Sequence, residues 1–424
     1  MAVRFISWGA TVFEAPTKLL HVLDCLDDNP HDLVCTCVSW NSTGRTIAVA
    51  YGRNDLDGWC GIPGALATWN LGREGPKEKP EAKIDCDCCL TACAFHPEKP
   101  ALIAGGTFNG DLYIWDTGED GGCQIGKSGI SHVSHQDSIS EISWLLSPQL
   151  GARRGRKDQM YQILTLGLDG RLLIWSWSAT ENPLFGFELS SGVPWGHGMA
   201  LWGGSSMGLP KDGITAVVGT VAGQVFHCSL DHNETMCKRF NEAATANEAP
   251  DLHWRSPIKE TEFESHAGPV CGVDCSPFQR DLFLSCGADG TIHMYSLLNG
   301  HSILSLEPAS HGLSSVKWSP SRPLVFAVAT DDGRVLFYDL GKSSFHPSET
   351  LDASEVSGSV SSMGFNKQFD SWFATAQGST TKIWELGQHL TREQSVEPTL
   401  VQFISEAASA GQPGTNIFQQ IQSK

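Results

Sequence analysis

The sequence has 424 residues, of which 41% are hydrophobic and 18% charged, and it contains 44 Gly, 21 Pro and 14 Trp. This composition is too apolar and too aromatic for a disordered chain, and the length allows two to four ordinary domains or one large repeat array. Asp and Glu number 47 against 29 Lys and Arg, a formal net charge of −18. Such a surface repels nucleic-acid phosphates and anionic lipids, so we expect no nucleic-acid partner and no membrane partner.

The compartment can be inferred from hydropathy and from the cysteines. Every apolar stretch falls well short of the ~20 residues that a spanning helix needs, and the first residues lack a signal-peptide pattern. Many of the 14 cysteines lie in strand-like apolar runs such as 34–38 and 270–273. This pattern favours reduced, buried thiols in a soluble, non-secreted protein over a disulfide framework.

One supersecondary pattern recurs about seven times along the chain: an apolar strand, a turn, a second strand, an Asp-Gly-like turn and a closing strand. The closing strands are predicted at 65–71, 112–116, 171–176, 224–229, 291–296, 334–339 and 381–385. Their spacings run from about 43 to about 67 residues, and the shortest match the roughly 40–45 residues of a four-stranded propeller blade. The longer spacings require insertions. In the fourth unit, at about 185–230, Cys228 replaces the closing aromatic residue, so six or eight blades remain open.

The fold class that follows is all-β: a single seven-bladed β-propeller of four-stranded antiparallel blades over residues 34–387. Residues 1–33 are predicted to form an N-terminal segment that includes a ring-closing strand, because a blade shared between the termini removes an exposed edge. Residues 388–424 show no blade pattern, and we expect a flexible tail or a short docking helix there.

Three units also carry a His, an Asp at the turn and a closing aromatic residue, a set able to form a buried hydrogen-bond chain that staples the blade. The predicted staples are His135 with Asp169 and Trp175, His266 with Asp289 and Tyr295, and His311 with Thr330, Asp332 and Tyr338. A catalytic triad is the alternative. Recurrence at one blade position favours the structural role. The sequence also has no P-loop motif, no paired metal-ligand spacing and no nucleophile-elbow motif, so we predict no catalytic residue, no cofactor, no metal site and no enzyme activity.

The repeats resemble the WD-repeat family, although Trp115-Asp116 is the one literal Trp-Asp pair. The first unit is more distinctive: the runs VSWNSTG at 38–44, AVAYGRND at 48–55 and ATWNL at 67–71 are similar to dynein intermediate chains, and most of all to those of cytoplasmic dynein-2. Stretches 162–170, 275–285 and 316–327 agree with the same family, so the similarity spreads over most units.

The resemblance implies a non-catalytic subunit of the motor that drives retrograde intraflagellar transport, located in the cytoplasm and in the cilium at the axoneme and basal body. In that family the propeller packs on the heavy-chain tail, while a preceding region recruits dynein light chains and pairs with the second dynein-2 intermediate chain. The predicted propeller begins at about residue 34, so we expect too little preceding sequence for light-chain motifs.

Two groups of residues are predicted to contact a partner. The first is the polar connection of the first unit, with Tyr51, Arg53, Asp55 and Trp59, and the second is the basic run of Arg153, Arg154, Arg156 and Lys157. On so acidic a chain the basic run is either a solvated loop or a dock for an acidic surface. The polar segments 117–131 and 231–265 are predicted to be loops, either mobile linkers or partner contacts.

The densest thiol cluster, Cys86-Asp87-Cys88-Cys89 with Cys93, is predicted to be buried strand thiols, with a zinc site as the alternative. A generic WD-repeat adaptor, such as a ubiquitin-ligase receptor or a chromatin-complex subunit, is the alternative function, followed by a propeller enzyme. An enzyme would require one central titratable cluster that is not repeated around the ring.

Overall fold

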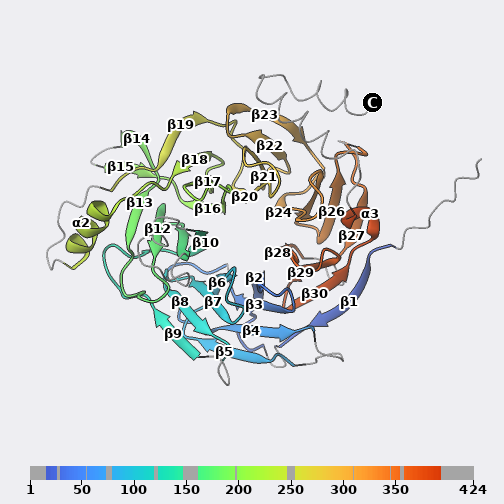
Figure 1. Ribbon diagram of the computed structural model, residues 1–424, viewed down its shortest axis with the longest axis horizontal. Helices are drawn as coiled ribbons and strands as arrows, with labels where there is room; N and C mark the ends of the chain where they lie inside the picture. Colours follow the sequence, from blue (N-terminus) through green and yellow to red (C-terminus); the bar gives the residue numbers. More distant parts are fainter. Residues whose placement is uncertain are drawn as a thin grey trace, which may run out of the picture.

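The computed structural model describes residues 16–25, 29–53, 55–72, 79–118, 123–146, 161–195, 198–245, 254–308, 310–343, 345–353 and 358–392. These residues form seven four-stranded antiparallel sheets, arranged as blades around a central axis (Figure 1), together with one small two-stranded sheet. The predicted seven-bladed β-propeller is therefore confirmed, and with it the choice of seven blades over six or eight.

The first three blades follow the chain in order, each with its innermost strand first. Blade 1 contains β2 (Val34–Trp40), β3 (Thr46–Gly52), β4 (Gly64–Asn70) and β5 (Ala82–Cys86); blade 2 contains β6 (Leu90–Phe95), β7 (Leu102–Thr107), β8 (Leu112–Asp116) and β9 (Cys123–Lys127); and blade 3 contains β10 (Ile139–Leu146), β11 (Tyr161–Gly167), β12 (Arg171–Trp175) and β13 (Phe185–Glu188).

The remaining blades follow a small hairpin of β14 (Ser190–Trp195) and β15 (Gly198–Leu201). Blade 4 contains β16 (Gly204–Gly208), β17 (Thr215–Thr220), β18 (Val225–Ser229) and β19 (Ile258–Glu262); blade 5 contains β20 (Val270–Cys275), β21 (Leu282–Gly287), β22 (Ile292–Ser296) and β23 (Asn299–Leu306); blade 6 contains β24 (Leu313–Trp318), β25 (Val325–Thr330), β26 (Arg334–Asp339) and β27 (Glu349–Asp352); and blade 7 contains β28 (Val360–Phe365), β29 (Trp372–Gln377), β30 (Thr380–Glu385) and β1 (Lys18–Leu23).

The hydrophobic core lies between neighbouring blades. The second strands β7, β17, β21 and β25 are buried along their whole length, because both of their faces pack against other blades. One core cluster joins Leu284 and Met294 of blade 5 to Val328 and Tyr338 of blade 6. Strands covered on both faces read as nearly continuous apolar runs, which explains the sequence pattern.

The start of the chain supplies the outer strand of the last blade. β1 pairs antiparallel with β30, with Lys18 opposite Glu385 and Leu23 opposite Thr381. In Figure 1 the blue β1 lies beside the red β30 and joins the two ends of the described chain. This pairing satisfies the open edge of β30 and closes the ring by backbone hydrogen bonds.

A ring of hydroxyl groups joins the blades near the central axis. Each inner strand contains one β-bulge near its start, and the bulged residue is Thr36, Thr91, Ser140, Ser205, Cys271, Ser314 or Ser361. Six of these side chains donate to a backbone carbonyl at the start of the next inner strand, at 2.5–2.9 Å, and among them Ser361 reaches Cys35 of blade 1. The bulge aims the hydroxyl at the neighbouring blade.

Blade 5 departs from this pattern, because Cys271 occupies the bulge. Its thiol contacts the carbonyl of Pro269 in the preceding connection at 3.5 Å instead of the inner strand of blade 6. A thiol is a weaker donor than a hydroxyl. The seam between blades 5 and 6 therefore lacks the hydroxyl bridge that the other six seams have.

The turn after the inner strand is capped by a polar side chain in several blades. Asn366 Oδ1 and His96 Nδ1 each accept two backbone N–H groups, and so do the hydroxyls of Ser276 and Ser319. His96 must be neutral to accept, and burial, with a smaller effect from Lys99, lowers its pKa to about 4. The Asn and His forms of the cap are thus interchangeable in geometry but differ in titration.

The predicted loop at 231–265 contains regular structure. Helix α2 (Glu234–Thr245) packs near β13, and β19 follows it. Phe240 of α2 contacts Phe185 at 5.5 Å and Trp254 at 5.5 Å between ring centroids. The connection also pairs Arg255 with Phe187, so blade 4 covers the outer edge of blade 3. Because residues 185–188 belong to blade 3, the predicted start of the fourth unit is wrong.

A buried ion pair fixes the end of the described chain. Arg322 and Asp339 are almost fully buried, and their charged groups lie 2.9 Å apart. Arg322 also donates to the His389 carbonyl in helix α3 (Gln388–Thr391), and the His389 imidazole contacts Glu349 at 3.0 Å. These contacts hold α3 against blade 6.

We predict that Ser361→Ala lowers the free energy of unfolding by about 1–2 kcal/mol, because two backbone carbonyls lose their hydroxyl donor at the seam between blades 7 and 1. Urea unfolding of the purified chain measures the change. Cys271→Ser is the converse variant and is expected to stabilise the chain or leave it unchanged. A Ser361→Ala variant as stable as the wild type would contradict the bridging role.

We predict a loss of stability on mild acidification that depends partly on His96. The unfolded chain takes up this proton below about pH 6.5 and the folded chain only near pH 4, so the free energy of unfolding falls as the pH drops through that window. His96→Asn preserves the cap and removes the titration. Between pH 7.5 and 5.0 the wild type should lose about 1–2 kcal/mol more than the variant. Equal losses in urea titrations at the two pH values would refute the prediction.

Candidate functional site

The first predicted staple forms a continuous hydrogen-bond chain. Trp175 Nε1 donates to Thr165 Oγ1 at 2.9 Å, and Thr165 Oγ1 lies 2.7 Å from His135 Nε2. On its other side, His135 Nδ1 lies 3.1 Å from Asp169 Oδ1. Burial raises the pKa of Asp169, but His135 and two backbone N–H groups outweigh burial, so the pKa stays below its usual value. Thr165, the central link of the chain, was not among the predicted staple residues.

The second staple ends differently. His266 Nδ1 lies 3.2 Å from Asp289 Oδ1, and His266 Nε2 lies 2.8 Å from Ser285 Oγ, the position that corresponds to Thr165. Tyr295 donates its hydroxyl to the Glu264 carbonyl at 2.7 Å, two residues before His266. The phenol therefore fixes the backbone that leads to the histidine.

The third predicted staple is wrong for His311, which is exposed and makes no hydrogen bond within the described residues. Asp332 instead accepts the Thr330 hydroxyl and pairs with Arg334, and Arg334 lowers the pKa of Asp332. The permanent charge of Arg334 takes the place of an imidazole. Tyr338 is buried and stacks on Phe326 at 5.2 Å, with its pKa raised to about 12 by burial.

Tyr51, in the first group of predicted contact residues, is buried with 0% exposure, so the prediction of a partner contact at Tyr51 is wrong. It lies at the end of β3 in the core cluster that contains Cys35 and Trp69. The run that follows Tyr51 leaves the strand and reaches the surface.

The other three residues of this group do lie at the surface, in the connection between β3 and β4. Arg53 and Asp55 form a two-point ion pair, with Nε–Oδ1 2.9 Å and Nη2–Oδ2 2.6 Å. Arg53 also donates to the His31 carbonyl at 3.2 Å. Trp59 is 78% exposed. The basic run of Arg153, Arg154, Arg156 and Lys157 lies outside the described residues.

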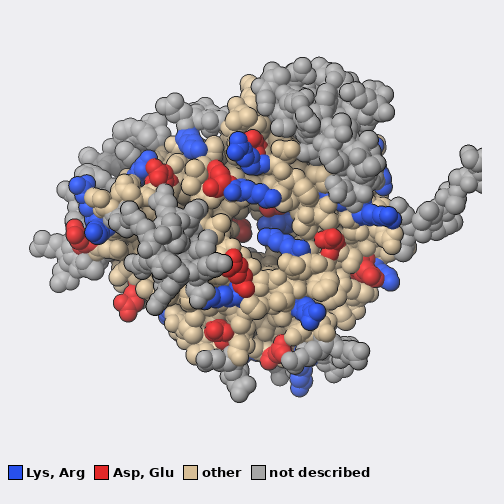
Figure 2. Space-filling model, viewed as in Figure 1, with Lys and Arg blue, Asp and Glu red and all other residues tan. Residues whose placement is uncertain are grey.

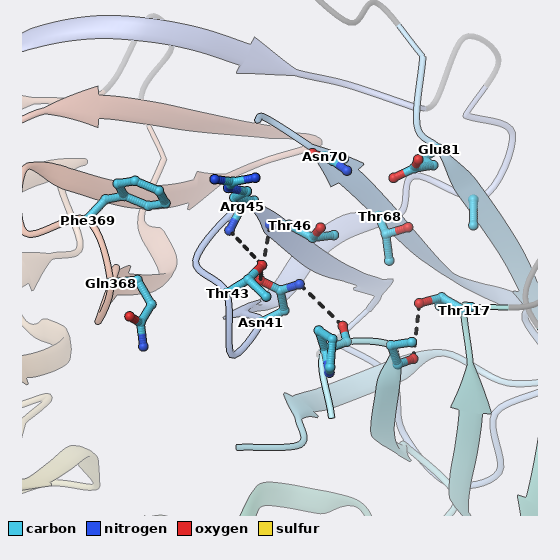
Figure 3. Close-up of a pocket in the computed structure, with 14 residues that line it drawn as sticks. Asn41, Thr43, Arg45, Thr46, Thr68, Asn70, Glu81, Thr117, Gln368 and Phe369 are labelled. Atoms are coloured by element: carbon cyan, nitrogen blue, oxygen red, sulfur yellow. Dashed lines mark hydrogen bonds between the residues drawn. The ribbon is translucent and has the colours of Figure 1, made fainter. Parts of the chain in front are cut away.

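A polar groove of about 900 Å³ lies between blades 1, 2 and 7 (Figure 3). It is at the ends of the strands opposite to the β3–β4 connection. Asn41 donates to the Pro100 carbonyl at 3.3 Å and accepts the Thr43 hydroxyl at 3.0 Å, and the Thr117 hydroxyl donates to Ala101. These polar groups thus maintain the turns themselves. Arg45 lies toward the blade 7 end of the groove in Figure 3.

Charged side chains also face the central axis, where Figure 2 shows an opening surrounded by residues of both signs. Lys317 on β24 interacts electrostatically with Asp274 on β20 and Glu141 on β10. Burial raises the pKa of both acids, whereas the two carboxylates outweigh burial at Lys317 and raise its pKa. The opposite charges partly compensate each other within the ring.

The thiol cluster is buried. Cys86, Cys88, Cys89 and Cys93 are free thiols, and burial raises the pKa of the first three to about 12. A neutral buried thiol is a poor nucleophile and a poor metal ligand. No group of three or more potential ligands within the described residues could hold a metal ion. In the part of the chain that the structure describes, no helix is long and apolar enough to cross a membrane.

We predict that Thr165→Val lowers the free energy of unfolding by about 2–4 kcal/mol, since the isosteric side chain leaves Trp175 Nε1 and His135 Nε2 without their buried partner. Urea unfolding measures the loss. His311→Ala is the control, expected within about 0.5 kcal/mol of the wild type because that imidazole is exposed. If Thr165→Val matches the control, the staple contributes nothing to stability.

Comparison with known proteins adds sequence relationships to this geometry. The "WD domain, G-beta repeat" family model matches residues 257–296 and 298–339. Cytoplasmic dynein 2 intermediate chain 2 of Mus musculus is 33% identical over 400 residues, which cover 92% of this chain and 71% of that protein. The Homo sapiens protein is 32% identical over 372 residues, covering 84% and 66%.

A more distant relative is the cytoplasmic dynein 1 intermediate chain of Drosophila melanogaster, 24% identical over 322 residues that cover 74% of this chain and 43% of that protein. The stronger similarity extends across nearly all seven blades, well beyond the two repeats that the WD model matches. The chain therefore belongs to the cytoplasmic dynein 2 intermediate chain 2 family.

Proposed function

We propose that this chain is a non-catalytic intermediate chain of the cytoplasmic dynein-2 motor, acting in retrograde intraflagellar transport and cilium assembly. The observation that carries the proposal is the 33% identity over 92% of the chain to a dynein 2 intermediate chain. The expected sites of action are the cytoplasm and the cilium, at the axoneme and basal body.

The propeller acts as a rigid platform in this proposal. Its His-Asp pairs recur at equivalent places in blades 3 and 5 and are hydrogen-bonded within the blades, which suits a structural role. Connections at both ends of the strands are free to differ between blades, and such loops on a rigid scaffold are common binding surfaces. ATP hydrolysis is assigned to another subunit of the motor.

Two partners are assigned to the propeller. The heavy-chain tail is the principal partner, and the second dynein-2 intermediate chain is its neighbour in the motor. We assign no dynein light chain to the propeller. The competing function is that of a generic WD-repeat adaptor in a ubiquitin ligase or chromatin complex. The experiment must distinguish this function from that of a dynein-2 intermediate chain.

The test is quantitative mass spectrometry of the proteins recovered with the tagged chain from ciliated cells at physiological salt. We predict enrichment of the dynein-2 heavy chain and the second intermediate chain over a control with the same tag on an unrelated propeller. Recovery of a ubiquitin-ligase or chromatin assembly without the heavy chain would contradict the proposal. Direct binding of the purified chain to a purified heavy-chain tail then establishes the contact.

A further inference from the structure

The connection between β3 and β4 is held in one conformation by contacts on both sides of Trp59. Cys60 donates its N–H to Asn109 Oδ1 and accepts from Asn109 Nδ2, each at 2.9 Å, which ties the connection to blade 2. Leu56 and Ile62 are half-buried and pack on the blade 1 core. The paired Arg53 and Asp55 brace the start of the connection.

Trp59 projects from this braced connection into solvent. Its exposure is 78%, although Cys60 next to it is 3% exposed. Gly58 has a φ of +75°, and a Cβ added at Gly58 or at Gly61 would meet no atom within 4 Å, so the tip stands clear of the blades. An indole exposed on a held backbone loses little conformational freedom on binding, which is the property of a binding anchor.

The surroundings of Trp59 are acidic. Asp57 is exposed, Asp55 is 67% exposed, and the Asp87 side chain is 93% exposed. Asp87 begins the connection from β5 to β6. This connection lies beside Cys60, the residue that follows Trp59, because the Cys60 thiol interacts with Cys88 and Cys89. Asp55 already neutralises Arg53.

A lysine close to Asp87 is also engaged by a second carboxylate. Lys127 lies 3.6 Å from Asp111 and 3.9 Å from Asp87. The connections that carry Asp57, Asp87 and Asp111 all lie at the same ends of the antiparallel strands, so they share one face of blades 1 and 2. That face carries an excess of carboxylates.

We propose that Trp59 is the anchor of the heavy-chain contact, inserting into an apolar pocket surrounded by Lys or Arg side chains on the heavy-chain tail. This inference rests on the proposed function. The exposed indole supplies the apolar contact, and the carboxylates of Asp57 and Asp87 match a basic surface and favour its approach. Asp55 stays paired with Arg53 and positions the loop.

Phe345 offers a matched control. It is an exposed aromatic residue, at 59%, but it lies in the connection between β26 and β27. That connection is at the opposite ends of the strands from the connection that carries Trp59, so Phe345 lies on the other face of the propeller.

The experiment measures binding of the purified full chain to immobilised dynein-2 heavy-chain tail by biolayer interferometry at 50, 150 and 300 mM NaCl. Trp59→Ala is expected to weaken binding about tenfold or more, with an unchanged thermal melt. Trp59→Phe should retain part of the affinity, and Phe345→Ala should stay within about twofold of the wild type. The double variant Asp57→Lys, Asp87→Lys should weaken binding most at 50 mM, because salt screens the lost attraction.

The outcomes distinguish a failure of the Trp59 anchor from a failure of the proposed function. If the wild type binds and Trp59→Ala binds equally well, the anchor is overturned and the intermediate-chain function stands. If Phe345→Ala abolishes binding instead, the contact lies on the opposite face. Failure of the wild type to bind the tail at 50 mM overturns the proposed function together with the inference.

Discussion

Closure of the ring is the constraint on which the rest of this structure depends. Blade 7 lacks its outer strand unless the two ends of the propeller meet, and β1 supplies that strand by pairing with β30. Near the axis, a hydroxyl at the bulge of one inner strand binds the start of the next in six of the seven blades, and Ser361 forms the bridge from blade 7 to Cys35 of blade 1. Backbone pairing of β1 with β30 at the rim and the Ser361 hydroxyl bridge near the axis thus both join blade 7 to the start of the chain.

Much of the fold could be predicted from local patterns. Asp-Gly turns and closing aromatic residues recur because every blade has the same strand order and packs against its neighbours in the same way. The spacing of the closing strands predicted seven blades. The hydroxyl bridges could not be predicted, although a Ser or Thr stands near the start of six inner strands, because the direction of a single hydroxyl in an apolar run is unknown until the bulge is known. The prediction for His311 was wrong because Arg334, two residues after Asp332, pairs with Asp332 instead. Sequence spacing alone does not show which of the two basic side chains binds the carboxylate.

The candidate contact surface was predictable only in part. Polarity and family resemblance pointed to the connection after β3, but Tyr51 belongs to the strand and is buried, whereas Trp59 is the residue that projects. Exposure of the indole depends on which residues anchor the loop. The anchor Asn109 lies 49 residues after Cys60 along the chain, so local sequence does not reveal it. The result is a platform in which buried polar chains hold the blades and a braced loop presents one large side chain.

The most direct test of this account is a cryo-EM structure of the chain bound to the dynein-2 heavy-chain tail. The account predicts the heavy chain on the face of blades 1 and 2 that carries the β3–β4 connection, with the Trp59 indole buried in an apolar pocket and basic side chains near Asp57 and Asp87. A complex in which the heavy chain binds elsewhere and Trp59 stays exposed to solvent would contradict it.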